Sequence, residues 1–171
     1  MPSSGRGTGV VLPTVTPYTP ATGVDAPSTV PPAPPPPDSS AATYAAPTSV
    51  ATAWMTQWCA TDYREPINAA IERAATFATP AGTAADLAKG DTPATYRTSV
   101  ELKVGNRCDH ISATVSPEAP RAPGAVYVVI TARRTQLADD HPFQVVPVVT
   151  TRAVLRQPDG RWLVDVHVEA G

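Results

Sequence analysis

The most regular alternation of apolar and polar residues lies near the end of the chain, in residues 145–168. Every second residue from Trp162 to Val168 is apolar, and this period of two predicts a half-buried strand. A β-branched and apolar run, 150–156, precedes it. The segment 157–160, Gln-Pro-Asp-Gly, has the composition of a tight turn. We therefore expect a long β-hairpin that closes the domain.

The register of this hairpin depends on the length of its loop. A three-residue loop with a glycine bulge places Leu163 opposite Leu155, whereas a two-residue loop places Val164 there. The pattern leaves both registers open.

Helical periodicity appears earlier in the chain. A helix is predicted to begin at Thr48 or Ser49, either of which can cap its first turn. Its apolar residues recur at i, i+3, i+4 and i+7, and they are Ala51, Trp54, Met55 and Trp58. The two tryptophans either form a ligand platform or face the core, and we favour the core.

Two shorter helices are predicted to follow. The first opens at Glu65-Pro66, since proline is accepted in a first helical turn. The second opens at Thr79-Pro80, continues through Leu87 and ends near Gly90.

After Pro93 the period changes to two. Strands are predicted over 97–104, 108–116, 125–137 and 143–156, with a turn at Gly105-Asn106 and a loop over 117–124. Pro147 lacks a backbone donor, so we expect a bulge or a sheet edge there. Helices followed by a meander predict an α+β fold, with the N-terminal helices packed on a curved antiparallel sheet.

The first 47 residues have a different composition. They contain twelve of the 21 prolines, together with Ser, Thr, Ala and Gly, and only Arg6, Asp25 and Asp38 are charged. Such a segment buries too little apolar surface to offset the entropy lost on ordering. We interpret residues 1–47 as a disordered linker and residues 48–171 as the folded domain. A proline-rich ligand for a recognition module is the alternative.

Composition narrows the possible functions. A formal net charge of −2 gives no electrostatic footprint for nucleic acid, even though 133–134, Arg152 and Arg156 could form a small basic strip. No run approaches the roughly 20 apolar residues that span a bilayer.

The order of elements, with Trp54 and Trp58 on the first helix and Asp-Gly-Arg-Trp in the last hairpin, resembles a known superfamily. It is similar to the cone-shaped α+β domains of the nuclear transport factor and ketosteroid isomerase superfamily, which includes SnoaL-like proteins. Within it, residues 48–169 resemble the TcpC-like conjugal transfer proteins of actinobacterial mobile elements. Their pattern is a membrane helix, a linker rich in Pro, Ala and Thr, and this domain. Residues 1–47 match the linker, and a membrane tether is expected outside this sequence.

The resemblance also indicates where chemistry would lie. In the superfamily the concave face of the sheet can hold an Asp with a His or Tyr for proton transfer, so Asp165, His167 and Tyr127 are candidates for a pocket. The alternative is that Asp165 and His167 mark the solvent side of a terminal strand, and we expect no catalytic partner for them. The alanine-rich helices permit close packing on the sheet, from which we expect a filled cone.

Other chemistry has little support in the sequence. Asp139, Asp140 and His141 could bind a metal weakly, but their spacing differs from that of a structural zinc site, and a solvated loop is the favoured interpretation. The chain shows no nucleophile elbow, phosphate loop or Cys-His-Asn signature. We expect no catalytic residues, no cofactor and no metal.

The two cysteines are Cys59, at the end of the first predicted helix, and Cys108, at the start of a strand expected beneath it. A disulfide between them would imply an oxidising compartment. The alternative is two reduced cysteines that pack as small apolar residues.

Together these observations predict a non-catalytic docking component of a conjugative, type IV secretion-like apparatus, located outside the cytoplasmic membrane. Its expected partners are other proteins of the apparatus and possible further copies of itself, without nucleic acid. The alternative is a small enzyme or ligand-binding protein that uses the cone pocket.

Overall fold

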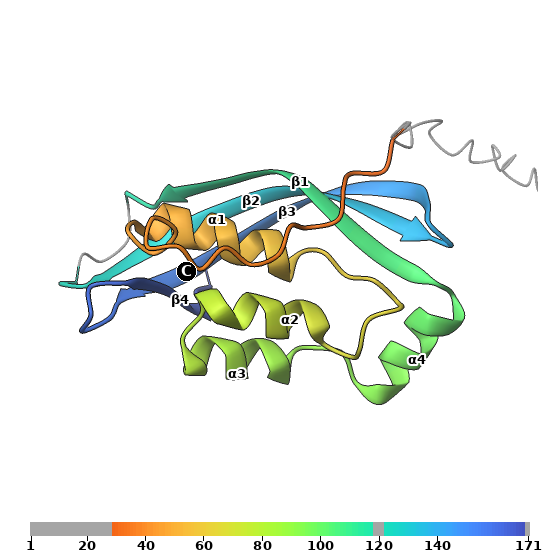
Figure 1. The fold of residues 1–171 in the computed structure, drawn as a ribbon, viewed down its shortest axis with the longest axis horizontal. Helices are drawn as coiled ribbons and strands as arrows, with labels where there is room; N and C mark the ends of the chain where they lie inside the picture. Colours follow the sequence, from red (N-terminus) through yellow and green to blue (C-terminus); the bar gives the residue numbers. More distant parts are fainter. Residues whose placement is uncertain (1–28, 118–121, 170–171) are drawn as a thin grey trace, which may run out of the picture.

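The computed structural model describes residues 29–117 and 122–169, which form an α+β fold (Figure 1). The helical part comes first, with α1 (Pro47–Trp58), α2 (Ala69–Ala74), the 3-10 turn η1 (Ala75–Phe77), α3 (Pro80–Ala88) and α4 (Pro93–Glu101). The strands follow as β1 (Val104–Val115), β2 (Ala125–Ala138), β3 (His141–Arg156) and β4 (Trp162–His167). They pair in chain order as one antiparallel sheet. The predicted fold class is confirmed.

The core lies between α1 and one face of the sheet. Trp54 and Met55 on α1 are buried, as are Val128 and Ile130 on β2 and Val154 on β3. In Figure 1, α1 runs in front of the strands, and α2 and α3 lie below it, with α3 in contact with β4. The apolar stripe predicted on the first helix therefore faces the core at Ala51, Trp54 and Met55, whereas Trp58 is only half-buried. Trp54 and Trp58 stack on each other, with ring centroids 5.0 Å apart.

The closing hairpin adopts the register with Leu155 opposite Leu163. The backbone N–H of Gln157 donates to the carbonyl of Arg161, and Gly160 has a φ of +87°, a conformation that favours glycine. Of the two registers left open, the one with the longer loop is correct.

Pro147 lies on an edge of the sheet. It pairs with Arg133 of β2, while β4 pairs with β3 only between Arg152 and Arg156. Within the described residues the other side of Pro147 has no strand, so its missing N–H interrupts no ladder there. The expectation of an edge is confirmed.

The predicted strand over 97–104 is wrong, because most of this segment is α4. Thr92 and Thr95 form a reciprocal capping box, and Pro93 occupies the first turn. These local signals outweigh the weak alternation of the segment. The predicted turn at Gly105-Asn106 is wrong too, because both residues lie inside β1.

The helix predicted from Glu65-Pro66 begins later, at Ala69. Asn68 adopts a left-handed conformation with a φ of +61°, so the chain is not helical before it. The helix at Thr79-Pro80 begins as predicted, and the Thr79 hydroxyl accepts a hydrogen bond from the backbone N–H of Gly82.

The boundary placed at residue 48 requires correction. Tyr44 is buried in the core, and its hydroxyl donates to the carbonyl of Thr76 over 3.0 Å. Gln57 on α1 donates its side-chain amide to the carbonyl of Pro35. The folded domain therefore begins before residue 48, because Tyr44 belongs to its core and Pro35 is bonded to α1. The rest of the predicted linker, 1–28, lies outside the described residues.

Candidate functional site

A cavity of about 890 Å³ lies between the sheet and the helices α2, α3 and α4. Its walls come from the end of α1, from the loop before α2, from those three helices, and from β1, β2, β3 and β4. The expectation of a filled cone is therefore wrong. The alanines that were expected to pack closely, Ala69, Ala70 and Ala85, line the cavity, and their small side chains leave it unfilled.

Part of the wall is apolar. Trp58 contributes from α1, Ile71 from α2, Val104 from β1 and Val166 from β4. Lys89 and Asp91, which are exposed, mark the side of the cavity that is open to solvent. The cavity thus combines an apolar wall with polar groups, as ligand-binding pockets do.

The most deeply buried polar pair at the cavity joins the sheet to α3. Arg152 on β3 donates to both carboxylate oxygens of Asp86, at 2.8 and 3.0 Å, and the two side chains are only 4% and 8% exposed. The guanidinium carbon of Arg152 also lies 4.6 Å from the centroid of the Trp54 ring. This geometry neutralises both charges, so the pair positions α3 on the sheet.

Arg134 on β2 occupies a different environment. Its side chain lines the cavity, and its guanidinium carbon lies 5.9 Å from the centroid of the Trp58 ring. Its Nε atom is buried and has no hydrogen-bond partner among the described residues. Burial lowers the pKa of Arg134, because the charged form loses solvation.

His167 reaches the cavity through a bulge between β3 and β4. Val164 pairs with Val154 and His167 pairs with Arg152, so two residues of β4 face one of β3. The extra residue turns His167 to the same face as Val164, which the simple alternation had placed on opposite faces. The His167 ring nitrogen Nδ1 lies 3.1 Å from the hydroxyl of Thr150, and both residues line the cavity.

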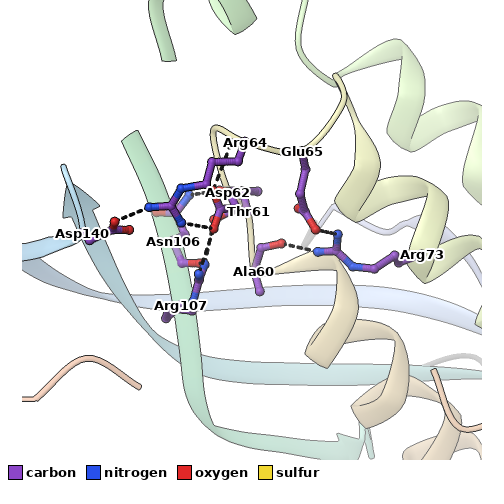
Figure 2. Close-up of polar contacts among 9 residues, drawn as sticks. All are labelled: Ala60, Thr61, Asp62, Arg64, Glu65, Arg73, Asn106, Arg107 and Asp140. Atoms are coloured by element: carbon purple, nitrogen blue, oxygen red, sulfur yellow. Dashed lines mark hydrogen bonds and ion pairs between the residues drawn. The ribbon is translucent and has the colours of Figure 1, made fainter. Parts of the chain in front are cut away.

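A polar network at one end of the cavity ties the loop before α2 to the sheet (Figure 2). Asp62 accepts from Arg107 on β1 at 3.0 Å and from Arg64 at 3.2 Å. Burial acts to raise the pKa of Asp62, but hydrogen bonds from the Arg64 backbone and from Arg107 outweigh it and lower the pKa. Arg64 also pairs with Asp140, in the turn between β2 and β3.

A second ion pair of this region joins Glu65 to Arg73 on α2, and Arg73 also donates to the carbonyl of Ala60 over 2.8 Å (Figure 2). The hydroxyl of Tyr96 on α4 donates to the carbonyl of Glu65 over 2.7 Å. These contacts fix the loop that forms one wall of the cavity.

The three pocket candidates from the sequence are not brought together. The carboxylate of Asp165 accepts from the hydroxyl of Thr79, and this contact supports the first turn of α3. Tyr127 alternates with the buried Val128 and so lies on the face of the sheet away from the helices. Of the three, His167 alone lines the cavity.

The candidate metal ligands are likewise engaged elsewhere. Asp139 pairs with Lys103, Asp140 pairs with Arg64, and the His141 ring nitrogen Nδ1 lies 2.6 Å from the carbonyl oxygen of Asp139. Within residues 29–117 and 122–169 no group of three or more His, Cys, Asp or Glu side chains is placed to hold a metal ion.

Cys59 and Cys108 are joined by a disulfide, and their Cα atoms are 6.0 Å apart. Of the two states left open by the sequence, bridge or free thiols, the structure has the bridge. It links the end of α1 to β1, and Cys59 is part of the cavity wall.

Arg134 and Arg152 were not predicted as site residues, although the sequence holds a signal for both. Each arginine falls on the face of its strand that also carries buried valines, Val128 on β2 and Val154 on β3. A charged residue on the same strand face as buried apolar residues indicates a buried ion pair or a binding site. The two arginines were instead grouped with their neighbours as a surface strip.

No helix within the described part of the chain is both long and apolar enough to cross a membrane. Comparison of this chain with family models, with curated proteins and with solved structures finds no match.

Proposed function

We propose that this protein binds a small molecule in the cavity between the sheet and α2, α3 and α4. The observation that carries the proposal is the cavity itself, whose volume of about 890 Å³ is lined by apolar and polar side chains. Pockets for drug-sized ligands span roughly 300–1,000 Å³ and have this mixed lining.

We favour binding over catalysis because the carboxylates at and near the cavity are engaged by other protein side chains. Asp165 accepts from Thr79, and Asp86 is held by Arg152. His167 has the hydroxyl of Thr150 beside it, rather than a carboxylate. A general base must reach the proton that it removes, and both carboxylates already accept hydrogen bonds from other protein side chains.

The proposed location is an oxidising compartment outside the cytoplasmic membrane. The disulfide between Cys59 and Cys108 supports this, since such bridges persist where thiols are not kept reduced. The Pro-rich composition of residues 1–28 supports a spacer that holds the domain away from a surface.

The test is to block the cavity and to measure binding of phenylnaphthylamine, a neutral apolar dye that fluoresces when it is bound. Ala85 lines the cavity, so Ala85→Trp should reduce dye affinity by about tenfold or more, as expected for loss of most of the buried contact area. The matched control is Ala84→Trp, which places the same side chain at the exposed neighbouring position of α3.

Equal affinities in the wild-type chain and in Ala85→Trp would show that the dye binds elsewhere. That result, or no binding by the wild-type chain, would remove the support for a ligand cavity.

We propose as a second candidate the docking role in a conjugative apparatus. The observation that favours it is the face of the sheet away from the helices, where Val149 is 67% exposed. At the end of the β2–β3 hairpin Phe143 is 53% exposed. Proteins of the apparatus or further copies of this chain are the proposed partners.

This second candidate requires that deleting the gene abolishes transfer, and that Val149→Arg reduces transfer without lowering protein level. The protein should also fractionate with the cell envelope. Normal transfer by the deletion strain would exclude the docking role.

A further inference from the structure

The acids of the cavity wall are mostly paired with arginines, but one arginine of the wall, Arg134, has no acid as its partner in the described part of the chain. Four acids contribute to the lining, and three of them are held in ion pairs by arginines, as Asp62–Arg107, Glu65–Arg73 and Asp86–Arg152. The fourth acid, Asp91, is exposed and accepts a hydrogen bond from the Thr95 hydroxyl. Arg134 has no acid assigned to it within the described residues.

Arg134 is also the cation that most needs a counter-ion. Its guanidinium is partly desolvated against Trp58, and its Nε atom is fully buried without a partner. Removing a charge from water is unfavourable unless the charge is paired, so buried cations almost always contact an anion. Arg134 is also one of the residues that line the cavity, so a ligand bound there would lie next to it.

We propose that the ligand of this cavity is an amphiphilic carboxylate, whose oxyanion is bound by Arg134 and whose apolar body packs on Trp58, Ile71 and Val166. This inference rests on the proposed ligand-binding function and adds the chemical class of the ligand. An arginine fork matches the two oxygens of a carboxylate, and the contact is stronger than in water because the site is partly desolvated.

A singly charged group fits the site better than a doubly charged one. Arg134 supplies one uncompensated positive charge, while Arg152 is neutralised by Asp86. Lys89, the other cation of the lining, lies at the exposed side. A phosphate monoester would therefore bring more negative charge than the buried part of the cavity can neutralise.

The test compares two dyes that share one aromatic body, namely the neutral phenylnaphthylamine and the singly charged anilinonaphthalenesulfonate. The wild-type full chain should bind the sulfonate about tenfold more tightly than the neutral dye, a factor typical of one charge-assisted hydrogen bond. Arg134→Gln should remove this preference, so that the two dyes bind with similar affinity. Arg134→Lys keeps the positive charge but loses the paired N–H donors of the guanidinium, so it should retain part of the preference for the sulfonate dye.

The matched control is Arg133→Gln, at the neighbouring position of β2. Arg133 points to the other face of the sheet, where it pairs with Asp109 at 2.7 and 2.5 Å. This variant changes the net charge by the same amount, so it should keep the preference for the sulfonate. Circular dichroism and thermal unfolding verify that each variant is folded.

Competition then identifies the anion. Decanoate should displace the sulfonate dye from the wild-type chain, whereas its methyl ester should compete at least about tenfold less well. Stronger competition by decyl phosphate would overturn the assignment to a carboxylate.

A preference for the sulfonate that persists in Arg134→Gln would overturn the role of Arg134. The cavity would stand in that case, provided that Ala85→Trp still weakens the neutral dye. If Ala85→Trp bound the neutral dye as tightly as the wild-type chain, the ligand-binding function itself would be refuted. Failure of the Arg134 role and failure of the ligand-binding function therefore give different results.

Discussion

Arg152 and Asp86 show how a single residue pair connects packing to the cavity. Both side chains are nearly inaccessible, and Trp54 lies against the guanidinium of Arg152. Removing one partner of such a pair leaves a charge in a medium that solvates it poorly, which costs far more than the pair contributes when intact.

The first prediction concerns this pair. Asp86→Ala should lower the free energy of unfolding by about 3–5 kcal/mol, because Arg152 would remain buried without a counter-ion. The double variant Asp86→Ala/Arg152→Met should lose less than the single variant, since it removes the stranded charge. Urea unfolding measures both, and a loss of under about 1 kcal/mol in Asp86→Ala would mean that solvent reaches the pair.

The second prediction concerns Asp62, whose pKa is lowered by its hydrogen bonds to the Arg64 backbone and to Arg107. A carboxyl with a folded pKa below its unfolded pKa gives stability that is complete above about pH 4 and is lost as the pH falls through the folded pKa. Asp62→Asn should therefore lower the free energy of unfolding at neutral pH by about 1–3 kcal/mol. The decline of that free energy between about pH 4 and pH 2 should become shallower.

Urea unfolding at a series of pH values measures this effect. Glu72→Gln serves as the control, because Glu72 is exposed and makes no ion pair among the described residues. An acid dependence in Asp62→Asn as steep as that of the wild type would contradict the prediction.

At the scale of elements, the position of α3 is set by close contact with β4. Thr79 caps α3, and its backbone N–H donates to the carbonyl of Val164 over 2.7 Å. Gly82 follows one turn later, where a Cβ atom would lie 3.0 Å from both the Val164 carbonyl oxygen and the Cα of Asp165. The glycine thus permits the approach that carries Asp86 to Arg152.

The third prediction follows from this contact. In an exposed helix, replacing glycine by alanine stabilises by about 1 kcal/mol. Gly82→Ala should instead destabilise by about 1–3 kcal/mol, because the new methyl group meets β4 backbone that has little freedom to move. Thermal unfolding measures the sign, and a raised melting temperature would show that α3 and β4 separate easily.

At the scale of the whole molecule, the disulfide joins the two parts of the fold. Cys59 ends the segment that contains α1, and Cys108 lies in β1, with α2, α3 and α4 in the loop between them. The cavity is bounded by that same loop, so the bridge constrains both the fold and the site.

The fourth prediction is that Cys59→Ala/Cys108→Ala lowers the free energy of unfolding by about 4 kcal/mol, the chain-entropy estimate for a loop of this length. A reductant should destabilise the wild-type chain by a similar amount and leave the double variant unchanged. An equal response to reductant in both proteins would argue that the bridge contributes nothing to stability.

Several secondary-structure elements could be predicted from the order of apolar and polar residues along the chain and from local capping signals. Alternation placed the hairpin of β3 and β4, the spacing of apolar residues placed the buried face of α1, and Thr79-Pro80 marked the start of α3. Each of these signals acts between residues that are close in the chain, so no tertiary information is needed to recognise it.

The candidate site depended on contacts between distant residues. The bulge that turns His167 toward Thr150 is a property of the pairing between two strands, and alternation within β4 gave the opposite face. The same holds for residues 29–46. Their proline-rich composition predicts disorder, whereas in the folded protein Tyr44 is buried in the core and packs against Phe77.

The sequence by itself determined the α+β class and the order of most elements, because backbone propensity and hydrophobic period are local quantities. The tertiary structure decided that the space under α2, α3 and α4 stays open, and that Arg152 is neutralised while Arg134 is not. The free energy of a buried charge depends on which groups surround it in space. The groups around the two arginines come from α1 and α3, which are far in the chain from the strands β2 and β3 that carry them.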